Sequence, residues 1–166
     1  MAKRTLSFLI CIVLIFCLNG CVLNGSSSSP KQEAMNYLFT NPYFSLRLPD
    51  SWRYLAIVEQ STGLADRTAN ILSFYERTSR ATYGGHIFSL ILWEENADYT
   101  DLPQYEFLGV LTDSTGARWH LVIVYPTDVQ FEPGAAGIYS QMANAETRIL
   151  QTLSPARNCS LALNAE

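Results

Sequence analysis

The chain has 166 residues, of which 48% are hydrophobic and 16% charged, and its formal net charge at pH 7 is -4. This length and composition suit one globular domain with a hydrophobic core. They exclude a disordered chain, which combines low hydrophobicity with high charge. The acidic balance also argues against a nucleic-acid partner, because binding to phosphates requires a surface rich in Lys and Arg.

Residues 1–20 have the features of a secretory signal peptide. Lys3 and Arg4 form a charged start, and residues 6–18 are an apolar run that is broken only by Ser7. About 20 apolar residues are needed to span a bilayer, so this run is short for a transmembrane helix. A plain secretory signal and an uncleaved single-pass anchor are the alternatives.

The signal ends in Leu18-Asn19-Gly20-Cys21, which resembles the lipobox of bacterial lipoproteins. That motif has an aliphatic residue, a small or polar residue, a small residue and an obligatory Cys. The resemblance implies cleavage before Cys21, which then carries a diacylglycerol thioether as the first residue of the mature protein. Two acyl chains are enough for stable anchoring, so we expect the mature chain on the extracytoplasmic face of the cell membrane.

Removal of residues 1–20 would leave 166 − 20 = 146 residues, with 11 − 2 = 9 basic and 15 acidic side chains and a formal charge of -6. An acidic domain is not drawn to anionic lipid, so the lipid on Cys21 would have to make the membrane contact. Cys11 and Cys17 lie in the signal. Cys159 is then the only Cys in the globular part, and no internal disulfide is expected.

We expect residues 21–40 to comprise the lipidated Cys and a flexible Ser-rich tether, residues 41–155 to form a single α+β domain, and residues 156–166 to be a polar C-terminal tail. Apolar alternation and apolar runs between turn signals predict six strands, at 44–48, 54–58, 71–75, 87–93, 105–111 and 119–125. The short connections predict a mainly antiparallel six-stranded sheet.

A C-terminal amphipathic helix is expected to pack on one face of this sheet. Its apolar stripe has helical spacing and consists of Ile138, Met142, Ala145, Ile149 and Leu153. The strands 87–93 and 119–125 are apolar at almost every position, which is typical of strands covered on both faces. Residues 31–39, or the loops 61–70 and 96–104, are the candidates for the second cover. Removal of the chain after Pro155 is expected to leave stability nearly unchanged.

Residues 44–52, FSLRLPDSW, resemble the opening motif of the PsbP/Mog1-like group. Segments 83–85, 102–109 and 125–130 are similar to small uncharacterised lipoproteins of Gram-positive anaerobes. The resemblance implies a PsbP/Mog1-like α+β domain that acts in binding or assembly rather than in catalysis.

The sequence contains few candidates for chemistry. Weak candidates for a cation site are four acids in one segment: Glu94, Glu95, Asp98 and Asp101. His86 and His120 lie in predicted strands, with no spacing that joins them to a Cys or a carboxylate. There is no Gly-x-Ser-x-Gly elbow and no phosphate-binding loop, so no catalytic residue and no cofactor is predicted.

The sequence therefore predicts a membrane-anchored extracytoplasmic lipoprotein that presents a non-catalytic binding or assembly module. An envelope protein or a glycan is the expected kind of partner, because the chain is rich in aromatic residues. We expect five aromatic side chains to be exposed in loops, namely Tyr43, Trp52, Tyr83, Tyr99 and Phe131. The alternative function is a metal-dependent or hydrolytic enzyme that uses the acidic segment 94–101 with a nearby His.

Overall fold

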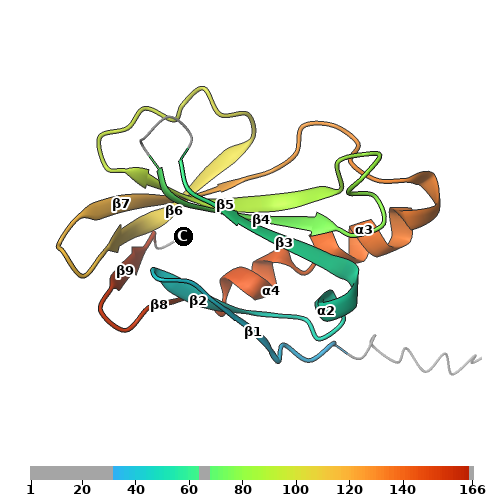
Figure 1. Ribbon diagram of the computed structural model, residues 1–166, viewed down its shortest axis with the longest axis horizontal. Helices are drawn as coiled ribbons and strands as arrows, with labels where there is room; N and C mark the ends of the chain where they lie inside the picture. Colours follow the sequence, from blue (N-terminus) through green and yellow to red (C-terminus); the bar gives the residue numbers. More distant parts are fainter. Residues whose placement is uncertain (1–31, 64–67, 165–166) are drawn as a thin grey trace, which may run out of the picture. The chain divides into compact units, whose positions relative to one another are not determined.

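Two antiparallel sheets and a C-terminal helical segment make up the fold (Figure 1). The computed structural model describes residues 32–63 and 68–164, with one compact unit from Glu33 onward. The larger sheet has six strands, in the spatial order β3 (Ala56–Ser61), β4 (Thr68–Glu76), β5 (His86–Glu94), β7 (Arg118–Val124), β6 (Tyr105–Thr112) and β9 (Ser160–Leu163). The predicted α+β class, with a six-stranded antiparallel sheet and a C-terminal helix, is confirmed at this level.

The smaller sheet has three strands, in the order β1 (Tyr37–Thr40), β2 (Phe44–Leu48) and β8 (Ser154–Pro155). The strand predicted at 44–48 therefore exists as β2, but it does not belong to the larger sheet. Phe44, Leu46 and Leu48 are all buried, as their alternation predicts. Alternation reports which face of a strand is buried and carries no information about which sheet the strand joins, so the predicted membership was wrong.

Both ends of the domain lie further out than the predicted range 41–155. β1 falls within the segment assigned to the tether, and β9 falls within the segment assigned to the polar tail. β9 pairs with β6 from Gly109↔Leu163 to Thr112↔Ser160. Such pairing is made by backbone groups, so a polar segment can complete a sheet. Because removal of residues 156–166 would remove β9, we now expect it to destabilise the domain.

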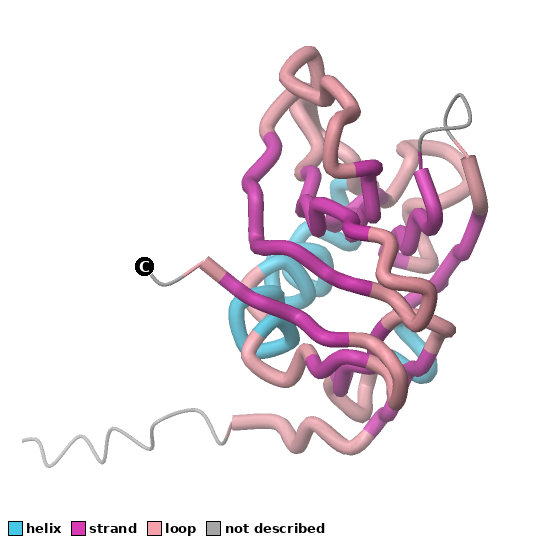
Figure 2. Tube along the Cα trace, turned by 90° about the vertical axis from the view of Figure 1, so that its left-hand side faces the viewer, coloured by secondary structure: helices cyan, strands magenta, loops and turns pink. Residues whose placement is uncertain are grey.

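The main core lies on the inner face of the larger sheet, where the small sheet and the helices cover it (Figures 1 and 2). At its centre is Trp52, the first residue of the short helix α2 (Trp52–Leu55). Its ring centroid is 5.8 Å from that of Phe74 and 6.4 Å from that of Phe88. Trp52 is only 2% exposed, so its predicted place in an exposed loop was wrong. Tyr83 is 43% exposed, as predicted.

The outer face of the larger sheet carries a second, smaller cluster. Ile91 and Trp93 of β5 meet Val122 of β7 there, whereas their neighbours along β5 point into the main core. Ala97, Tyr99 and Leu102 pack on this cluster, and all three belong to the loop 96–104. The prediction that the apolar central strands are covered on both faces is confirmed, and this loop supplies part of the second cover.

The predicted C-terminal helix is divided into two. A 3-10 turn, η1 (Pro133–Ala135), leads into α3 (Ala136–Ala143), and α4 (Glu146–Leu150) follows after a break. Met142, Ala145 and Ile149 are buried as the stripe predicts. Ile138, in the first turn of α3, is 37% exposed, and Leu153 lies beyond α4 and is half-buried. The centre of the stripe is thus correct. Of its two ends, Ile138 is exposed, whereas Leu153 packs on the main core from beyond the helix.

Candidate functional site

The acids singled out in the sequence lie at the end of β5 and in the loop after it. Glu95 is paired with Arg118, with 2.8 Å between Oε1 and Nε, and Asp98 Oδ1 accepts two hydrogen bonds from Thr100. Glu94 and Asp101 are exposed. Within residues 32–63 and 68–164, no three His, Cys, Asp or Glu side chains form a group that could hold a metal ion. The geometry gives the metal-enzyme alternative no support, and the predicted lipidation site Cys21 lies outside the described residues.

The two histidines have hydroxyl groups as hydrogen-bond partners. His120 Nδ1 is 3.0 Å from Tyr99 Oη. His86 Nε2 is 2.8 Å from Ser89 Oγ, which is in turn 2.7 Å from Ser73 Oγ. Burial, together with the nearby charge of Arg80, lowers the pKa of His86 and favours its neutral ring. A serine that is hydrogen-bonded to a neutral histidine is one part of a catalytic nucleophile–base pair. Both serines, however, are buried on the face of the sheet.

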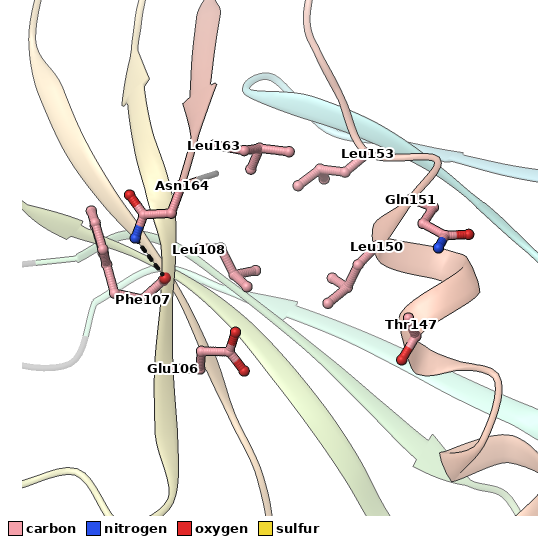
Figure 3. Close-up of a pocket in the computed structure, with 9 residues that line it drawn as sticks. All are labelled: Glu106, Phe107, Leu108, Thr147, Leu150, Gln151, Leu153, Leu163 and Asn164. Carbon is pink, nitrogen blue, oxygen red and sulfur yellow. Dashed lines mark hydrogen bonds between the residues drawn. The ribbon is translucent and has the colours of Figure 1, made fainter. Parts of the chain in front are cut away.

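A pocket of about 390 Å³ lies between α4 and the β6–β9 edge of the larger sheet (Figure 3). Its apolar walls are four leucine side chains: Leu108, Leu150, Leu153 and Leu163. Polar groups at its margin belong to Glu106, Thr147, Gln151 and Asn164. A volume above about 300 Å³, with a mostly apolar lining and a few polar groups, is typical of a small-molecule site.

An irregularity in strand pairing shapes the β6 wall. The register between β6 and β7 passes from Phe107↔Val122 to Gly109↔Leu121, so Leu108 is an extra residue. Phe107 packs on the outer cluster, whereas Leu108 packs on the main core. Such a bulge re-aims side chains, and here it adds an apolar side chain to the pocket.

The close approach of β9 to β6 depends on the missing side chain of Gly109. A Cβ at this position would lie 2.2 Å from the carbonyl oxygen of Ala162 and 2.8 Å from Leu163 Cα. Just beyond β9, the Asn164 backbone N–H donates to the Leu108 carbonyl at 2.9 Å, and its side-chain amide donates to the Phe107 carbonyl (Figure 3). These bonds hold Leu163 at the pocket wall.

One end of the pocket is acidic. Glu106 lines it, and close by the Tyr125 hydroxyl donates a hydrogen bond to Glu146 over 3.2 Å. Burial raises the pKa of Tyr125, and the negative charges of Glu146 and Glu106 raise it further. The negative charges of Glu106 and Glu146 are therefore both felt in the region around the Tyr125 hydroxyl. Among the described residues that line the pocket, Glu106 is the only charged one.

Sequence reasoning did not find this pocket. The one local signal was Gly109, because an isolated glycine inside a strand marks a bulge or a close backbone approach. The alternation of Leu161, Ala162 and Leu163 was too short to predict a strand in a segment with a polar start.

No protein-family model matches the chain, and no curated protein or solved structure is significantly similar to it. In the described part of the chain, every helix is too short or too polar to cross a bilayer.

Proposed function

We propose that the domain is a non-catalytic binding module whose pocket, between α4 and the β6–β9 edge, takes a small ligand with an apolar body. The observation that carries this proposal is the pocket itself, with four leucines around about 390 Å³. Burial of an apolar ligand there is favourable by about 25 cal/mol for each Å² removed from water. The described side chains offer no competing arrangement of nucleophile, base and metal.

A fluorescence assay tests this proposal. The neutral fluorophore N-phenyl-1-naphthylamine should brighten on binding, and 1-octanol should displace it. Gln151 is exposed at the pocket margin, so Gln151→Trp places a large ring at the mouth and should weaken binding by about tenfold or more. Gln141 is also exposed, on α3 and outside the lining, so Gln141→Trp is the matched control. Equal binding by both variants would contradict the proposal.

We further propose that the module is held on the extracytoplasmic face of the membrane by a lipid on Cys21. The charged start, the short apolar run and the sequence Leu18-Asn19-Gly20-Cys21 support this proposal. A PsbP/Mog1-like fold is likewise a proposal, supported by the motif at residues 44–52. An envelope protein or a glycan remains the expected partner for the surface outside the pocket.

A further inference from the structure

The pocket has two chemically different ends. Figure 3 shows Leu153 and Leu163 at one end, Leu108 and Leu150 in the middle, and Glu106 with Thr147 at the other end. A ligand that fits this arrangement has an apolar body and one polar head. Since a water molecule takes about 30 Å³ of liquid volume, the pocket holds on the order of a dozen non-hydrogen atoms.

The charge at the polar end of the pocket determines which charge the polar group of a ligand can carry. Glu106 has an exposed side chain and contributes the only charge among the lining residues that the structure describes. Glu146, which accepts the Tyr125 hydrogen bond, adds a second carboxylate in the same region. The nearby Arg148 guanidinium on α4 donates to the Glu33 carbonyl and is not part of the lining. A carboxylate or phosphate head would thus meet repulsion, whereas an ammonium head would gain a charge-assisted hydrogen bond.

We propose that the pocket binds a small primary amine with an apolar body, and that Glu106 is the residue that selects the ammonium group. This inference rests on the proposed binding function and adds to it the chemical class of the ligand. A partly exposed carboxylate should favour the cation by about tenfold over a neutral head of equal length. The Thr147 hydroxyl at this end of the pocket donates to Glu146 Oε2 at 3.3 Å, and its oxygen can accept a hydrogen bond at the same time.

Displacement of N-phenyl-1-naphthylamine by a matched series tests the inference. The competitors are 1-octylamine, 1-octanol and octanoate at pH 7, which share one chain length and differ in head charge. We expect octylamine to displace the fluorophore at about one tenth of the octanol concentration, and octanoate to be the weakest. Within the Glu106→Gln variant, octylamine and octanol should displace the fluorophore at similar concentrations, so the preference for the amine is lost. Glu94→Gln removes an exposed carboxylate from the end of β5, outside the lining, and should leave the whole series unchanged.

The outcomes separate the two proposals. If octanol binds in a manner that Gln151→Trp weakens, but octylamine gains nothing and Glu106→Gln has no effect, the amine inference is overturned and the binding function stands. If none of the three compounds displaces the fluorophore, or if Gln151→Trp has no effect on any of them, both proposals fall. Loss of the octylamine preference in Glu94→Gln as well would show a general charge effect and would also overturn the inference.

Discussion

Asp113 organises the hairpin between β6 and β7 with a single carboxylate. Its Oδ1 accepts hydrogen bonds from the Thr115 backbone at 2.8 Å and from the Thr115 hydroxyl at 2.6 Å, and its Oδ2 accepts one from Trp119 Nε1 at 3.0 Å. Gly116 supplies the positive φ of +86° that the turn needs. Asp113 and Gly116 satisfy this turn by contacts within a few residues, which is why such a turn leaves a local signal in the sequence.

These hydrogen bonds lower the pKa of Asp113 to about 2, with the Thr115 hydroxyl as the largest cause. A depressed folded-state pKa means that the stabilisation is complete above the ordinary value of 3.8 and is lost as the pH falls through about 2. In Asp113→Asn the Nδ2 group cannot accept the bond from Trp119. We expect Asp113→Asn to melt at a lower temperature than the unmodified chain at pH 7. The difference between the two melting temperatures should shrink between about pH 4 and pH 2.

Thermal unfolding followed by circular dichroism from pH 2 to pH 7 measures this effect. Asp101→Asn, in an exposed part of the loop after β5, is the control for the loss of one negative charge. A difference between Asp113→Asn and the unmodified chain that stays constant over this pH range would contradict the role assigned to the carboxylate.

At the level of elements, β9 contributes both to the stability of the domain and to the wall of the pocket. It completes the larger sheet against β6, and its Leu161 packs on the main core. Gly109→Ala would push a Cβ against backbone atoms of Ala162 and Leu163, which cannot turn away as a side chain can. We expect β9 to detach, at a cost of about 2–4 kcal/mol from lost strand pairing and lost burial of a leucine.

Urea unfolding together with N-phenyl-1-naphthylamine binding checks this prediction, because displacement of Leu163 should weaken both. A chain that ends at Pro155 should show the same two losses. Gly134→Ala is the matched control, since a Cβ there meets nothing within 4 Å. If Gly109→Ala unfolds at the same urea concentration as the unmodified chain, β9 contributes little to the fold.

The elements found from sequence and those missed differ in length and in the range of their contacts. The predicted strands at 71–75 and 87–93 fall within observed strands, and the one at 119–125 extends one residue beyond β7, because five or more apolar or alternating residues carry a strong periodic signal. The strands β1, β8 and β9 have four, two and four residues, half or more of them exposed. β8 and β9 exist because a distant strand offers unpaired backbone groups, and no local pattern records that, whereas β1 pairs with the neighbouring β2.

At the scale of the whole molecule, the dependence on contacts between distant segments also explains why the pocket was not predicted. The pocket walls come from residues 106–108, 147–153 and 163–164, which meet only when the larger sheet is complete. The acids that the sequence singled out were neighbours along the chain, yet Glu95 is paired with Arg118 and Asp98 bonds to its own turn. Proximity in sequence therefore pointed to the end of β5 and not to the β6–β9 edge, and the carboxylate that lines the pocket, Glu106, was not among the candidates.

Attachment to the membrane is the remaining prediction for the whole chain, and Cys21 is the residue that decides it. In a bacterial host supplied with an alkyne-labelled palmitate, the full-length chain should take up the label and fractionate with membranes, because diacylation supplies two acyl chains. Cys21→Ala should carry no label and should not be processed normally. Cys159→Ala removes the half-buried thiol near the C-terminus and should be labelled as the unmodified chain is. An unmodified chain that stays in the membrane without taking up the label would instead indicate an uncleaved apolar anchor. Secretion of the unmodified chain without label would indicate a plain signal peptide.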